Sequence, residues 1–177
     1  MDDKKKKFYT IIKARSDENE KALALLLEAR CYALIGGIIR MELDSLVRVH
    51  YFNNTDSKEQ NLLLDKFFMG SKWPNTDRNM VNYLASSLGG AEHIYDFCCA
   101  FIHLSPYHDW ASLSDVPSLT IAKRHSIVNE IKEQQNDVWG YDTKLNINDD
   151  FKFDDLLLFA PHIFKKLRGN LMLELNS

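Results

Sequence analysis

The stretch that decides the fold is NEKALALLLEARCYALIGGIIRMELDSLVRVHYF, which covers residues 19–52. Its apolar residues recur at three- and four-residue intervals, the spacing that gathers side chains on one face of an α-helix. One face holds Leu23, Leu26, Leu27, Leu34, Ile38 and Met41, and a second holds Leu25, Ala29, Tyr32, Ile35, Ile39, Leu43 and Leu46. A helix that is apolar on more than one face is enclosed by other helices. The stretch therefore predicts a long central helix.

Two features indicate where this helix begins and whether it is straight. Ser16 or Asp17 suits an N-cap, because a short polar side chain accepts a hydrogen bond from the first turn. Gly36 and Gly37 offer a place where the helix could bend or divide into two. We favour the unbroken helix.

The rest of the chain predicts about five to six further helices around the central one. Glycine (7) and proline (4) are scarce, which favours helices with few turns over a β-fold. The further helices are expected at about 58–69, 77–88, 91–104, 118–135 and 154–173, the last of them interrupted at Pro161. The core face of that last helix should be Ile163, Phe164, Leu167 and Leu171. The predicted fold class is an all-α helical bundle.

Length and composition favour one domain in a reducing compartment. The 177 residues, 45% of them hydrophobic, suit a single domain over residues 1–177, in which residues 1–15 form a flexible, lysine-rich leader. The three cysteines have no paired spacing and predict free thiols. No stretch has the pattern of a signal peptide or is long and apolar enough to cross a membrane, so a cytoplasmic protein is expected. The net charge of −3 makes specific DNA binding unexpected.

The central helix carries the first group of candidate functional residues. Arg40, Asp44 and Arg48 follow one another at four-residue spacing, so they form one stripe, and Glu42 lies beside them in the sequence. A salt-bridge ladder that supports the fold explains this stripe. A site that binds an anion or catalyses a reaction explains it as well. Both interpretations stay open.

The segment HLSPYHDW, residues 103–110, is the densest group of polar and aromatic residues. Histidine can act as an acid, a base or a metal ligand near neutral pH. His103 and His108 are the candidate catalytic residues, with Ser105 and Tyr107 as candidate ligand-binding residues. The structural alternative is a helix end whose polar side chains cap the backbone. Asp96 joins Glu42 and Asp44 as a candidate ligand-binding carboxylate.

Other chemistry finds less support in the residues. A metal site would need His103 and His108 to meet a carboxylate such as Asp44 or Asp96, and no spacing requires it, so no metal and no cofactor are expected. Cys99 precedes His103 by one helical turn, but packed thiols are the expectation for Cys98 and Cys99. The remaining histidines, His50, His93, His125 and His162, have no supporting partners in the sequence.

Two segments carry a resemblance to a known group of proteins. Residues 29–51, ARCYALIGGIIRMELDSLVRVHY, and residues 101–108, FIHLSPYH, resemble a family of uncharacterised bacterial helical proteins. That family is similar to the HEPN superfamily of small helical bundles, which are common in toxin–antitoxin and abortive-infection systems. The resemblance covers about residues 20–110 and implies a metal-independent ribonuclease. HEPN ribonucleases use an Arg and a His separated by four to six residues, a motif that this chain lacks, so Arg40 or Arg48 would supply the arginine.

Three candidate functions are consistent with these observations. The first is a HEPN-like domain that binds a nucleotide or cleaves RNA, with His103 or His108 as the base and Arg40 or Arg48 holding the phosphate. The second is a non-enzymatic helical interaction module with an exposed apolar patch near Trp73, Trp110 or Trp139 and a homodimer or a protein as partner. The third is a metal-dependent hydrolase on a helical bundle.

Overall fold

The computed structural model describes residues 3–88, 91–102 and 153–177, and all of its regular structure is helical. Within these residues there are six helices and no strand, which confirms the all-α fold. The helices are α1 (Asp3–Glu28), α2 (Tyr32–Asn53), α3 (Ser57–Phe68), α4 (Asp77–Ala85), α5 (Ala91–Ile102) and α7 (Phe153–Asn176). The helix predicted at 118–135 and the segment 103–110 lie outside the described residues.

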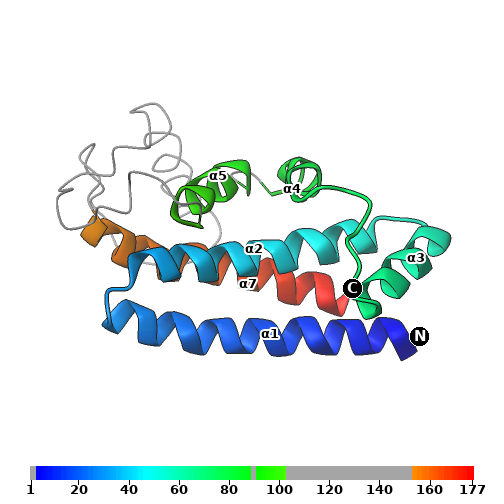
Figure 1. Cartoon of the computed structure of the whole chain (residues 1–177), viewed down its shortest axis with the longest axis horizontal. Coiled ribbons are helices and arrows are strands. Elements are labelled where there is room, and N and C mark those ends of the chain that lie inside the picture. Colours follow the sequence, from blue (N-terminus) through cyan, green and yellow to red (C-terminus); the bar gives the residue numbers. More distant parts are fainter. Residues whose placement is uncertain (1–2, 89–90, 103–152) are drawn as a thin grey trace.

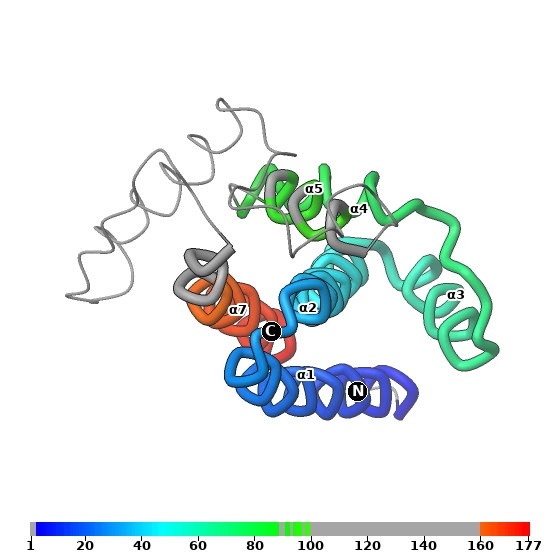
Figure 2. Tube along the Cα trace, turned by 60° about the vertical axis from the view of Figure 1, so that its left-hand side comes forward, coloured from blue at the N-terminus to red at the C-terminus, as the bar shows by residue number. Residues whose placement is uncertain are grey.

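Helix α2 is the centre of the arrangement. It packs against α1, α3, α4, α5 and α7, and α1 also packs against α7. Figure 1 shows α1 along one side of α2 and the pair α4 and α5 along the other. Figure 2 shows α1, α2 and α7 as three neighbouring rods, with α3 beside the first part of α1. The start of α1 lies near α3 (Figure 2), and the end of α7 lies beside the end of α2, where Glu174 contacts Asn53.

The central helix is shorter than residues 19–52, because the chain turns at residues 29–31. Arg30 has a φ of +54°, a left-handed conformation that only glycine adopts without cost. The amides of Arg30 and Cys31 donate to Leu27 O and Leu26 O, which closes the end of α1. The prediction of an unbroken helix is therefore wrong, and so is the proposed break at Gly36–Gly37, since both glycines lie inside α2.

Residues 3–15 belong to the fold, which corrects the prediction of a flexible leader for this part of the chain. Helix α1 begins at Asp3, and Phe8, Tyr9 and Ile12 are buried in the core. These three residues continue the apolar face of α1 toward Leu23 at helical spacing. The lysines before them are mostly exposed, and lysine is a good helix former. A charged run at the beginning of this chain is thus the solvated first turn of a core helix.

The last helix also differs from its prediction. Helix α7 continues through Pro161, which is exposed on its surface. A proline removes one backbone hydrogen bond, but burial of the following residues offsets this cost. The predicted core face is confirmed, because Ile163, Phe164, Leu167 and Leu171 are all buried.

The short helices α3 and α4 each begin just after a residue whose side chain caps the first turn. The Asp56 side chain accepts a hydrogen bond of 2.8 Å from the amide of Glu59, and Thr76 caps α4 in the same manner through Asn79. Gly70, with a φ of +66°, ends α3 in the left-handed conformation. The loop after Gly70 places Trp73 against Phe8, so Trp73 is buried and forms no exposed patch.

Candidate functional site

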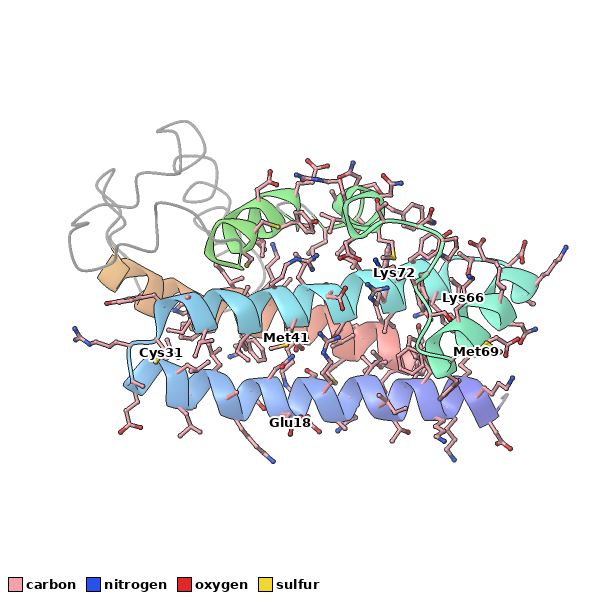
Figure 3. The ribbon with its side chains drawn as sticks, viewed as in Figure 1. Glu18, Cys31, Met41, Lys66, Met69 and Lys72 are labelled. Atoms are coloured by element: carbon pink, nitrogen blue, oxygen red, sulfur yellow. The ribbon has the colours of Figure 1, made fainter. Side chains whose placement is uncertain are left out.

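The candidate residues of α2 meet the start of α4. Arg40 Nη2 lies 3.2 Å from Asp77 Oδ2, and Arg48 Nη2 lies 2.8 Å from Asp77 Oδ1. Two guanidinium groups from α2, two turns apart, thus hold one carboxylate. Arg48 also bonds Asp44 through Nε at 2.9 Å, the i, i+4 pair that the sequence predicts, and Arg15 of α1 reaches Asp44 at 3.2 Å. Figure 3 draws the side chains of the described residues as sticks over the ribbon.

A second set of contacts extends the group toward α5. The ring of Tyr95 lies against two guanidinium groups, with the Cζ of Arg40 at 4.3 Å and the Cζ of Arg78 at 4.7 Å from its centroid. Arg78 also pairs with Asp96 at 2.6 Å. We call Arg15, Arg40, Arg48 and Arg78 the arginine cluster. Among the described residues the cluster pairs with three aspartates, Asp44, Asp77 and Asp96, so its four positive charges exceed these three negative charges by one.

Arg40 is the most enclosed member of the cluster. Only 11% of its side chain is exposed, and its Nη1 is buried without a hydrogen-bond partner among the described residues. Burial by itself lowers the pKa of Arg40, but the neighbouring Asp44, Tyr95 and Asp77 outweigh it, so this pKa lies above its ordinary value. Arg40 is therefore a fixed cation. Asp77, by contrast, has 41% of its side chain exposed.

Glu42 occupies a different face of α2 and is not part of this cluster. Its side chain is fully buried between α1 and α2, where Ser16 donates to Oε1 and Asn19 Nδ2 donates to Oε2 at 2.9 Å. Arg168 of α7 donates to the same Ser16 hydroxyl and pairs with Asp17 at 2.6 Å. This polar group thus ties three helices together inside the core.

The structure does not describe the other predicted site residues. His103, Ser105, Tyr107 and His108 lie outside the described ranges. Within those ranges, no group of three or more His, Cys, Asp or Glu side chains has the geometry of a metal site. Cys98 is buried, which raises the pKa of its thiol above its usual range, and Cys99 is half-buried. Nor does any described helix combine the length and apolar character that crossing a bilayer requires.

Comparison of the chain with protein-family models, with curated proteins and with solved structures finds no match. The HEPN resemblance therefore stays a prediction. Any function proposed for this chain has to be supported by the contacts of its own residues.

A group of side chains around His50 was missed by the sequence analysis. His50 Nδ1 lies 2.6 Å from Glu174 Oε1, and His50 Nε2 lies 3.2 Å from Ser87 Oγ. Asn53 Nδ2 donates to Glu174 Oε2 at 2.8 Å, and the hydroxyl of Tyr9 donates to Asn53 Oδ1. The partners in these bonds are 37 to 124 positions apart in the sequence, so no local motif could reveal the group.

Two tyrosines should make the fold sensitive to alkali. Burial, aided by the charge of Glu174, raises the pKa of Tyr9 to about 12, and burial with the neighbouring Glu59 raises the pKa of Tyr51 to about 12. The ordinary value is about 10, so above that pH the unfolded chain loses protons that the folded chain retains. Stability should be unaffected below about pH 10 and fall as the pH rises toward about 12.

Urea denaturation across this alkaline range measures the effect. The Tyr9→Phe variant should lose less stability with rising pH than the unmodified chain, because it cannot ionise at that position. A tyrosinate absorbance titration in which all tyrosines of the folded chain ionise together at the ordinary pKa would contradict the prediction.

Proposed function

We propose that this chain is a HEPN-like domain that binds RNA and cleaves it without a metal. The observation that carries the proposal is the convergence of Arg40 and Arg48 on the carboxylate of Asp77. A carboxylate and a phosphate present similar oxygen pairs, and arginine binds both with two parallel hydrogen bonds. Asp77 would then occupy, in the free protein, the position that a substrate phosphate takes.

The exposure of Asp77 and the charge of RNA support the replacement of the Asp77 carboxylate by a substrate phosphate. The side chain of Asp77 is 41% exposed, so solvent reaches the point where the two guanidinium groups meet. Arg40 is held in place by the ring of Tyr95, and Arg48 lies 5.4 Å from the centroid of Trp73, which limits the movement of both cations. An RNA strand offers several phosphates, so its charge near the cluster exceeds that of the single carboxylate that it would displace. Binding would therefore strengthen the contacts of the cluster.

Cleavage needs a base as well as this anion site. In the proposed reaction His103 or His108 removes the proton of a ribose 2′-hydroxyl, and the 2′-oxygen attacks the adjacent phosphorus. The bond from phosphorus to the 5′-oxygen breaks, and this oxygen takes the proton that the histidine removed. Arg40 and Arg48 would stabilise the charge that develops on the phosphate oxygens.

Fluorescence anisotropy with a short mixed-sequence RNA tests the anion site. Arg48→Gln should weaken binding about tenfold or more, because a charge-assisted hydrogen bond contributes about 1.5–3 kcal/mol. Asp77→Asn should strengthen binding, because the variant removes the competing carboxylate. Arg30→Gln, which removes an arginine from the turn between α1 and α2, is the matched control and should leave affinity nearly unchanged.

The cleavage assay is run with and without EDTA, beside a His103→Ala/His108→Ala variant. Cleavage that survives EDTA and is lost in the variant supports the proposal. Equal binding by Arg48→Gln, Asp77→Asn and the unmodified chain would show that the cluster serves the fold alone.

A helical interaction module is the second candidate, favoured by apolar side chains that the fold leaves uncovered. Leu25 and Leu34 flank the turn between α1 and α2 and are 67% and 59% exposed, and Met41 is exposed further along α2. Figure 3 places Met41 on the near side of α2, above α1. If this surface joins two copies of the chain, sedimentation analysis should show a dimer that Leu34→Glu dissociates. A monomer at all concentrations would count against this candidate.

A further inference from the structure

Three side chains from separate parts of the chain form a hydrogen-bonded row near the end of α7. Ser87, just beyond α4, places its Oγ 3.2 Å from Nε2 of His50 on α2. The other ring nitrogen of His50, Nδ1, lies 2.6 Å from Oε1 of Glu174 on α7. A hydroxyl, an imidazole and a carboxylate in this order are the constellation by which a serine becomes a nucleophile.

The two hydrogen bonds of His50 place its proton where activation of the Ser87 hydroxyl requires it. A carboxylate can only accept, so Glu174 fixes the proton of neutral His50 on Nδ1. Nε2 then has a free lone pair that faces the Ser87 hydroxyl. The same hydroxyl lies 3.0 Å from Leu84 O. Its proton can therefore point to Leu84 O in the free protein or to the more basic Nε2 of His50. His50 can take that proton when Oγ attacks.

A further layer of contacts holds the carboxylate in place. Asn53 Nδ2 donates to Glu174 Oε2 and to the backbone oxygen of Glu174, both at 2.8 Å. Asn53 Oδ1 in turn accepts from the buried hydroxyl of Tyr9, and the raised pKa of Tyr9 keeps this donor protonated. The ring of Tyr83 lies 5.6 Å from that of His50 and restricts its rotation. The imidazole is therefore oriented from both sides.

The three groups differ in exposure in the way that catalysis requires. Ser87 is exposed, so a substrate reaches its Oγ from solvent. His50 and Glu174 are mostly covered, with 13% and 23% of their side chains exposed.

We propose that Ser87, His50 and Glu174 form an acyl-transfer site for small activated carboxylic esters. Ser87 Oγ attacks the ester carbonyl carbon while its proton passes to His50 Nε2. The bond to the leaving alcohol breaks, and the alcohol takes the proton from His50. Water then repeats the two steps on the acyl-serine and releases the carboxylic acid. Ser87 and His50 are the catalytic residues, and Glu174 is a positioning residue.

This site uses none of the residues assigned to RNA. Its failure would leave the RNA proposal standing, and loss of RNA binding would leave this one standing.

The test is covalent labelling of the full chain with a fluorophosphonate probe, with mapping of the modified peptide. The label should appear on Ser87 and disappear in Ser87→Ala. Ser86→Ala is the matched control, because Ser86 is also exposed at the end of α4 but donates to Tyr83 O, at 2.7 Å. His50→Gln should slow labelling and p-nitrophenyl acetate hydrolysis about a hundredfold or more, the usual contribution of a general base.

Two further measurements separate catalysis from a structural role. The labelling rate of the unmodified chain should depend on pH, and His50→Gln should lose that dependence, which a serine that serves only the fold would not show. Glu174→Gln, checked for folding by circular dichroism, should slow labelling while Ser86→Ala does not. Absence of label on Ser87, or an equal rate in folded His50→Gln, would overturn the proposal.

Discussion

Replacing Phe8 with alanine is expected to lower the free energy of unfolding by about 3–5 kcal/mol, the usual cost of removing a buried aromatic ring. Phe8 is fully buried, and its ring centroid lies 4.8 Å from that of Phe67 and 5.3 Å from that of Phe52. It also contacts Trp73 at 6.2 Å. The ring therefore joins α1, α2, α3 and the loop before α4, and alanine would leave a cavity among all four.

Urea denaturation monitored by circular dichroism measures this loss. Leu25→Ala is the control on the same helix, because 67% of Leu25 is exposed and its truncation should change stability by at most about 0.5 kcal/mol. A single domain has about 5–15 kcal/mol of stability in total, so the Phe8 variant would lose a large share of it. Equal stability of the two variants would mean that the start of α1 is frayed in solution and contributes little to the core.

The sequence predicted which segments are helical, but it did not predict where the helices begin and end. Apolar spacing predicted the core face of α7 and the helical character of residues 19–52. It missed the turn at Arg30, because the local signal for a left-handed residue is glycine or asparagine and this chain has neither there. It favoured an unbroken helix and offered only Gly36–Gly37 as an alternative bend, although both glycines lie inside α2 and a Cβ at Gly37 would meet no atom within 4 Å.

In the candidate site, too, the sequence predicted a local contact but not the contacts between helices. The i, i+4 pairing of Asp44 and Arg48 is local, so the sequence could predict it. Asp77 meets the two arginines only because α4 packs against α2. The spacing of residues along the sequence does not reveal such a contact between helices. His50 illustrates the limit most clearly, since its partners Ser87 and Glu174 come from other helices or their ends.

Glu42 carries the second large expected effect. Glu42→Ala should lower the free energy of unfolding by about 3–5 kcal/mol, because two buried donors lose their acceptor at about 1–3 kcal/mol each and a cavity remains. The donors are the hydroxyl of Ser16 and the amide of Asn19, both buried on α1. Glu42→Gln should be intermediate, since one of its two oxygens becomes an NH₂ group that faces a donor.

A third variant shows whether the stability lost in Glu42→Ala comes from unsatisfied hydrogen-bond donors or from lost packing. Replacing Ser16 with alanine and both Asn19 and Glu42 with leucine removes donors and acceptor together, and buried polar groups exchanged for apolar ones of similar size often cost nothing. Arg168 would keep Asp17 at 2.6 Å and Glu20 at 3.3 Å. We expect this triple variant to recover most of the stability that Glu42→Ala loses, as measured by urea denaturation.

The two variants together reveal what the buried polar group does for the fold. If the triple variant is as unstable as Glu42→Ala, the loss comes from shape at this position and the hydrogen bonds matter little. If it is stable, Glu42 contributes little net free energy, and its role is to specify how α1, α2 and α7 are aligned, since only one register lets Ser16 meet both Glu42 and Arg168. That alignment also determines how Arg15 meets Asp44 beside the arginine cluster.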